Sequence, residues 1–132
     1  MNYPQSEVEW RLKWLWFGCG FILLLLIAIL SLMPVSGVGG GDKIGHVFMY
    51  AVLSSWFSLI VSRTGLLWFV LLGAISYGLL MEFLQSLTDY RGAEFADAVA
   101  NSIGALLGLL FHFSPFRRWL VMIDARLDQL RQ

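Results

Sequence analysis

The chain has 132 residues, of which 58% are hydrophobic and 14% are charged, and its mean hydropathy is +0.73. A soluble domain has about 25% charged residues, and one of this size buries only about 60–70% of its surface. This composition therefore excludes a soluble enzyme, a disordered tail and a disulfide scaffold. Nine basic and nine acidic residues cancel, which argues against nucleic-acid binding. A small all-α integral membrane protein of one domain is the prediction that remains.

Long uncharged runs predict four transmembrane helices, because a spanning helix needs about 20 predominantly apolar residues. The predicted spans are 15–33, 44–62, 66–87 and 95–113. None of these runs alternates with period two, which favours helices over strands. The last two connections are short turns, and they make neighbouring helices antiparallel, so the fold class is a four-helix membrane bundle.

The residues that follow Pro115 predict a fifth, amphipathic helix at 116–131. Apolar residues recur there at helical spacing: Trp119, Leu120, Ile123, Leu127 and Leu130. We expect this helix to lie on the inner surface of the membrane, and a partner-binding helix is the alternative.

The distribution of lysine and arginine predicts the orientation of the chain. Four spans place both termini on one side of the membrane. Seven of the nine basic residues lie on that side, namely Arg11, Lys13, Arg63, Arg117, Arg118, Arg126 and Arg131. Both termini are therefore predicted to be cytoplasmic. Tryptophans typical of a membrane boundary fall at the same depth: Trp10, Trp14, Trp16, Trp68 and Trp119.

Polar side chains gather near the opposite, outer ends of three predicted spans. Ionisable residues within spans are costly and mark functional sites by default. The candidate ligand-binding residues are Asp42, Lys43, His46, Tyr50, Glu82, Gln85, Arg91, Asp97 and Asn101. The antiparallel topology brings His46, Glu82 and Asp97 to one depth, about 5–10 Å below the outer surface. The inner half of the predicted bundle is almost wholly apolar, which argues against an ion channel.

The spacing within this set indicates how its members are arranged. Asp42, His46 and Tyr50 are four residues apart and share one helical face. We expect Glu82 or Asp97 to pair with Arg91 or Lys43, because isolated charges in lipid cost several kcal/mol.

In chain order, these residues form a pattern that resembles the VanZ-like family of bacterial membrane proteins. The pattern reads Asp42-Lys43-x2-His46-x3-Tyr50, Glu82-x2-Gln85, Arg91, and Asp97-x3-Asn101-x2-Gly104-x3-Gly108. The resemblance covers 42–108 and implies a four-helix bundle in the bacterial cytoplasmic (inner) membrane. The family takes its name from a protein that lowers sensitivity to the glycopeptide teicoplanin. Most of its members have no established biochemical activity, so the resemblance implies no particular reaction.

Two classes of function remain open. In the first, the polar site binds the head group of a membrane lipid or a lipid-linked cell-envelope precursor. Lys43 and Arg91 would then contact phosphate, for which arginine offers bidentate geometry. Amide and hydroxyl groups would bind sugar or peptide groups, and the acids with His46 would set the charge.

The alternative is a membrane-embedded hydrolase or transferase in which His46 acts with Glu82 or Asp97 as a general base. The same side chains could bind Zn²⁺. The chain has no HExxH or GxSxG motif, however, and we expect neither a metal nor another cofactor. The sequence also leaves open whether the chain forms a homo-oligomer.

Overall fold

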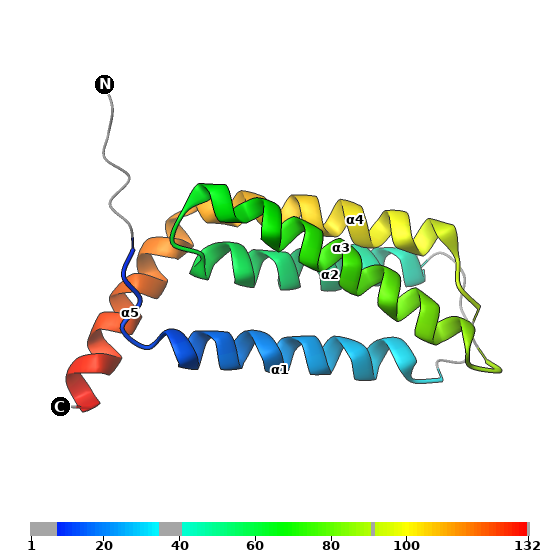
Figure 1. Cartoon of the computed structure of the whole chain (residues 1–132), viewed down its shortest axis with the longest axis horizontal. Helices are drawn as coiled ribbons and strands as arrows, with labels where there is room; N and C mark the ends of the chain where they lie inside the picture. The colour runs from blue at the N-terminus through cyan, green and yellow to red at the C-terminus, as the bar shows by residue number, and fades with distance from the viewer. Residues whose placement is uncertain (1–7, 35–40, 91, 132) are drawn as a thin grey trace, which may run out of the picture.

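The computed structural model describes residues 8–34, 41–90 and 92–131, and these residues form helices joined by short connections (Figure 1). The α-helices are α1 (Lys13–Leu32), α2 (Gly41–Ile60), α3 (Leu67–Ser86), α4 (Phe95–Leu109) and α5 (Pro115–Arg131). Two short 3-10 helices are η1 (Thr64–Leu66), which leads into α3, and η2 (Leu110–Phe113), which follows α4. The prediction of an all-helical chain is confirmed for this part of the molecule.

Four helical segments are long and apolar enough to cross a membrane. They are Lys13–Leu32, Lys43–Ile60, Thr64–Ser86 and Phe95–Phe113. Each lies within two residues of a predicted span at both ends, because uncharged runs delimit the helices. Many large apolar side chains on these segments face outward: Phe21, Ile22, Phe48, Phe69, Leu72, Phe83 and Leu106. An outer surface of this kind suits a lipid environment.

The closest packing in the bundle joins α2 and α4. A Cβ atom on Gly104 would collide with the backbone carbonyl oxygen of Val47, and one on Gly108 would collide with that of Ala51. Glycine at these two positions therefore lets the helix backbones approach closely. This approach fixes how side chains at the start of α4 meet those near the start of α2.

α1 lies along the side of the other three long helices (Figure 1). Side chains of α3 donate hydrogen bonds to its backbone, from the Tyr77 hydroxyl to the Leu24 oxygen at 2.6 Å and from Gln85 Nε2 to the Ser31 oxygen at 2.8 Å. Between α1, α2 and α3 lies an apolar groove of about 420 Å³, lined by Phe17, Leu24, Leu53, Phe57, Phe69 and Tyr77. These hydrogen bonds fix α1 against α3 at separate positions, and an apolar groove lies beside α1.

α5 crosses the end of the bundle where α1 begins (Figure 1). Trp119 and Leu130 point away from the other helices, since they are 66% and 84% exposed. Asp124, by contrast, is only 2% exposed and faces the bundle. The predicted amphipathic helix is confirmed, and Asp124 is its buried contact with the rest of the protein.

Candidate functional site

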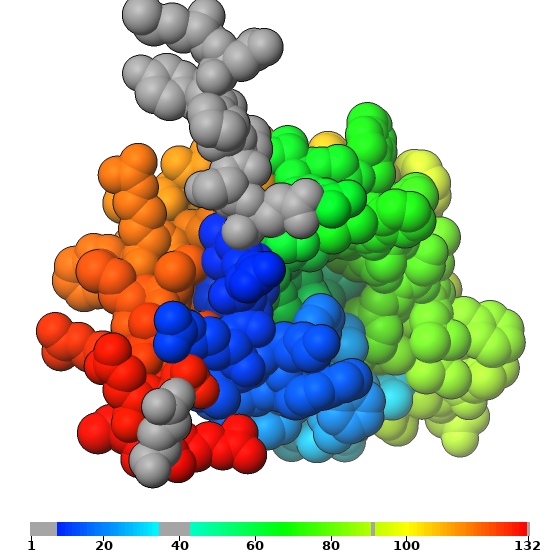
Figure 2. Space-filling view, turned by 60° about the vertical axis from the view of Figure 1, so that its left-hand side comes forward, coloured from blue at the N-terminus to red at the C-terminus, as the bar shows by residue number. Residues whose placement is uncertain are grey.

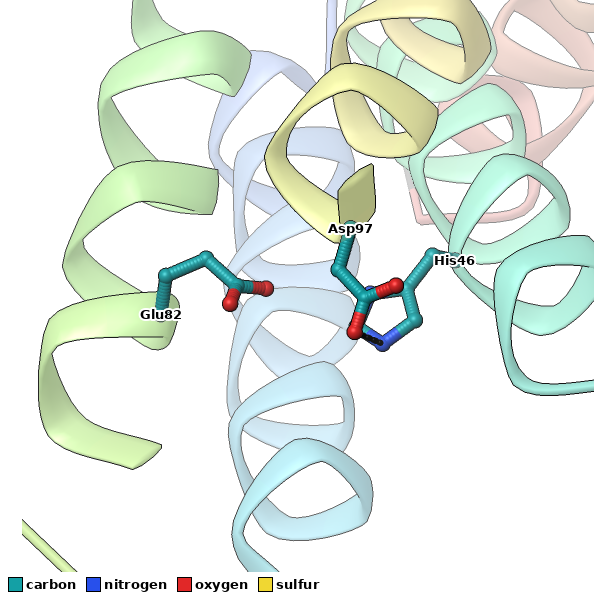
Figure 3. A group of neighbouring side chains, drawn as sticks. All are labelled: His46, Glu82 and Asp97. Carbon is teal, nitrogen blue, oxygen red and sulfur yellow. Dashed lines mark ion pairs between the residues drawn. The ribbon is translucent and has the colours of Figure 1, made fainter. Parts of the chain in front are cut away.

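Side chains from three helices meet at the end of the bundle opposite α5 (Figure 3). They are His46 of α2, Glu82 of α3 and Asp97 of α4. One ligand atom from each lies within 4.8 Å of the others. The residues are 2%, 6% and 5% exposed, respectively. The predicted convergence is confirmed for these three residues, which we call the triad.

Helix direction explains why the triad forms. His46 lies in the second turn of α2, Asp97 lies in the first turn of α4, and Glu82 lies one turn before the end of α3. α2 and α4 therefore start at the end of the bundle where α3 finishes. The N-terminal end of α4 also favours the negative charge of Asp97.

The His46 ring is oriented by an amide. Its Nδ1 lies 2.9 Å from the Oδ1 atom of Asn101, which accepts a hydrogen bond. A carboxamide oxygen can only accept, so Nδ1 carries a proton in this contact, and Nε2 faces the Oδ2 atom of Asp97 at 3.7 Å. The pair can act as a base with its orienting partner or as two ligands of one cation.

The carboxylates of Asp97 and Glu82 are each contacted by a group from the surface of the protein. Lys43 Nζ lies 3.4 Å from Asp97 Oδ1 and 3.1 Å from Glu94 Oε2. The Glu94 backbone N–H donates to Glu82 Oε2 at 3.2 Å. The predicted pairing of Asp97 with Lys43 is therefore confirmed. Glu94 was not among the predicted ligand-binding residues; its position directly before α4, three residues from Asp97, was the available signal.

Two buried donors beside the triad find no hydrogen-bond acceptor among the described residues. They are the hydroxyl of Tyr50 and the Nδ2 group of Asn101, on residues that are 0% and 1% exposed. Tyr50 lies one turn beyond His46 on α2. A Cβ atom on Gly78 would lie 3.2 Å from both side chains, so glycine at this position lets them reach α3.

The remaining predicted site residues are placed differently. Gln85 donates to the backbone of α1 and so joins helices. The backbone of Asp42 belongs to α2, but its side chain lies outside the described part of the chain, as does Arg91. The expected contacts of Asp42 and Arg91 stay predictions.

The chain is similar to a fission yeast protein. It is 34% identical over 107 residues to "Uncharacterized protein C11E3.10" of Schizosaccharomyces pombe. The matched stretch covers 78% of this chain and 66% of the relative, so the chain spans just under two thirds of that protein's length. No protein-family model and no solved structure matches the chain. Because this relative is eukaryotic and its name states no activity, the similarity supports neither a bacterial membrane nor a ligand.

The half of the bundle nearer α5 also buries polar groups, so the prediction that this half is almost wholly apolar is wrong. His112 Nδ1 donates to the Ser58 carbonyl oxygen at 2.7 Å. Arg117 Nη2 donates to the carbonyl oxygens of Val61 and Ser62 at 2.8 and 3.1 Å. These bonds satisfy carbonyls near the end of α2, which a helix terminus leaves unpaired.

Asp124 links α5 to α1 and was missed by the sequence analysis. Its carboxylate accepts hydrogen bonds from Arg11 N at 2.9 Å, Leu12 N at 3.0 Å and Trp16 Nε1 at 2.7 Å. It thereby holds the two residues directly before α1 against another helix. Figure 2 shows the last turns of α5, in red, beside the first turns of α1, in blue.

Burial opposes the charge of Asp124, but the bonds from Trp16, Arg11 and Leu12 outweigh this effect and hold the pKa of the carboxyl below its ordinary value. The available sequence signal was an acid placed between Leu120 and Leu127, at the spacing of the apolar residues of α5. Trp16 is buried, at 7% exposed, and therefore contributes to this contact more than to a membrane-facing belt.

Proposed function

We propose that this chain is a VanZ-like integral membrane protein that binds the polar head group of a lipid or lipid-linked cell-envelope precursor at the triad. One observation carries the proposal: three long apolar helices bury His46, Glu82 and Asp97 together at one end of the bundle. Ionisable groups are expensive inside a membrane, and a polar ligand accounts for that cost. Lys43, which is half exposed at the rim of the site, supplies a contact for phosphate.

The apolar groove beside α1 suits the hydrocarbon part of such a ligand. Its lining includes Tyr77, which lies five residues before Glu82 on α3 and so about 7.5 Å away along the helix axis. An amphiphile with its head group at the triad can therefore place an acyl chain between α1 and α3. This arrangement favours a lipid-linked ligand over a free sugar or peptide.

The proposal places the triad at the outer face of a bacterial inner membrane, with both termini in the cytoplasm. This orientation is supported by the excess of basic residues on the side of the termini, which includes Arg63. Maleimide labelling of Gly39→Cys in a Cys19→Ser background tests this orientation. Labelling of intact cells by a membrane-impermeant reagent is the expected result. Labelling only after lysis would reverse the orientation.

Native mass spectrometry of the purified chain tests head-group binding. We expect co-purified lipid in the wild-type protein and less lipid in Lys43→Ala and Glu82→Gln. Asp128→Asn is the matched control, because it removes an acid at the opposite end of the bundle and should retain wild-type lipid content. Equal lipid content in all four proteins would reject the triad as the binding site.

A membrane-embedded hydrolase or transferase is the second candidate, and the His46 geometry favours it. Asn101 orients the ring, and Asp97 stands at its other nitrogen, as expected for a general base and its partner. An enzyme predicts that His46→Gln abolishes conversion of the co-purified lipid while lipid is still bound. A binding protein predicts that affinity falls gradually across several substitutions and that the lipid is never converted.

A further inference from the structure

The triad combines the donor atoms of a metal site. It offers one imidazole nitrogen and two carboxylates, a set found among protein ligands of Zn²⁺ and related divalent ions. His46 Nε2 and Asp97 Oδ2 lie 3.7 Å apart. At Zn²⁺ bond lengths near 2.0–2.1 Å, neighbouring ligands of a tetrahedral ion lie roughly 3.4 Å apart. Small side-chain rotations therefore bring these atoms to ligand spacing.

Each side chain of the triad is contacted by a further polar group, as metal ligands are by the outer shell of a metal site. Asn101 Oδ1 accepts from His46 Nδ1, which leaves Nε2 directed at Asp97. Lys43 contacts Oδ1 of Asp97, and the Glu94 backbone N–H contacts Oε2 of Glu82. Outer contacts of this kind fix the tautomer of a ligating histidine and orient ligating carboxylates.

The charges in the site call for a cation. The distance of 3.7 Å between His46 Nε2 and Asp97 Oδ2 is longer than a charge-assisted hydrogen bond, which measures about 2.7–2.9 Å. The buried carboxylates of Glu82 and Asp97 offer oxygen atoms within 4.8 Å of each other, and two negative charges this close repel when both groups are ionised. A divalent ion between the three removes this repulsion.

The two buried donors beside the triad point independently to a bound oxygen atom. The Tyr50 hydroxyl and Asn101 Nδ2 are fully or almost fully buried and find no acceptor among residues 8–34, 41–90 and 92–131. Buried donors are normally satisfied. A bound water molecule beside the triad would accept from them.

From these observations we infer that His46, Glu82 and Asp97 bind one divalent metal ion of the zinc class. No metal was expected from the sequence, because the three ligands come from three helices and form no local motif. One consequence rests on the proposed head-group function. The described part of the site holds three carboxylates and one lysine, so a divalent ion would supply the positive charge that attracts phosphate.

Calorimetric titration with ZnCl₂ tests the inference on the full chain in detergent, after treatment with chelator and removal of lipid. We expect one Zn²⁺ per wild-type chain. His46→Gln and Asp97→Asn should bind at least about 100-fold more weakly, since loss of an outer-shell partner alone costs roughly 10–100-fold. The control is His112→Asn, which changes the other buried histidine and should keep wild-type affinity.

X-ray absorption at the zinc edge of the wild-type protein gives a second readout that needs no variant to fold. We expect one imidazole, with oxygen atoms as the other ligands. Absence of stoichiometric zinc, a sulfur ligand, two imidazoles, or an equal loss of affinity in His112→Asn would overturn the metal site. Zinc binding by a chain that retains no lipid in the mass spectrometry experiment would support the metal site and reject the head-group function.

Discussion

The two ends of the bundle bury polar groups in opposite ways. Near α5, the Asp124 carboxylate accepts three hydrogen bonds and His112 donates to a backbone carbonyl. At the triad, His46 Nε2 and Asp97 Oδ2 lie 3.7 Å apart beside a second carboxylate, and the neighbouring Tyr50 hydroxyl finds no acceptor among the described residues. Satisfied polar groups stabilise a fold, whereas local conflicts concentrate at functional sites. Burial of polar residues alone would not have distinguished the two ends.

The largest expected effect comes from Gly104, which lies between the two ends. A methyl group on Gly104→Ala would enter the space of the Val47 carbonyl and separate α2 from α4. We expect the free energy of unfolding to fall by about 3 kcal/mol, measured by denaturant unfolding in detergent. Zinc binding should fail as well, because His46 and Asp97 lie on these two helices.

The control for this substitution is Gly73→Ala on α3, where a Cβ atom would meet nothing within 4 Å. Alanine is the better helix former, so this variant should be unchanged or stabilised by up to about 1 kcal/mol. An equal loss in both variants would indicate that close packing of α2 and α4 is not the cause.

A smaller loss, confined to one end, is expected for Asp124→Ala. The substitution leaves the donors of Arg11, Leu12 and Trp16 without their acceptor, which should cost about 2 kcal/mol. Zinc affinity of the triad should not change. Asp128→Ala is the control, because its ion pair with Arg11 is exposed and contributes at most about 1 kcal/mol. Loss of zinc binding in Asp124→Ala would show that the two ends are coupled.

Acid should weaken the α5 end selectively. The pKa of Asp124 is lower in the folded chain than its ordinary value of 3.8, so its charge stabilises the fold fully above that value. This contribution is lost as the pH falls through the lowered folded pKa. The difference in unfolding free energy between the wild-type protein and Asp124→Asn should therefore shrink between pH 6 and pH 3. A constant difference across this range would contradict the assignment.

The smallest effect on stability is expected for Glu82→Gln, although this variant should lose zinc and lipid. Glutamine keeps an acceptor for the Glu94 backbone N–H and removes one of two adjacent negative charges. The free energy of unfolding should change by less than about 0.5 kcal/mol or rise. Glu82→Leu removes the acceptor as well and should be the less stable of the two. A large loss of stability in Glu82→Gln would make the triad a structural element.

The spans and the meeting of the triad could be predicted because both follow from counting along helices. Uncharged runs set the helix ends, and antiparallel order puts His46, Glu82 and Asp97 at one depth. The partner of Gln85 could not be predicted, since it depends on the rotation of α3 against α1. The role of Asp124 depends on a contact between residues 113 positions apart, for which a single sequence gives no register.

The hydrogen bonds between Asp124 and the start of α1 have a consequence for biosynthesis. α1 is translated before the other helices, yet the carboxylate that accepts the backbone N–H groups of Arg11 and Leu12, directly before α1, is translated 112 residues after Leu12. During synthesis those groups depend on water, and α1 stays attached through its bonds with α2 and α3. Completion of α5 is therefore the step that fixes the start of α1. A chain stopped before residue 124 should form its long helices without completing their assembly.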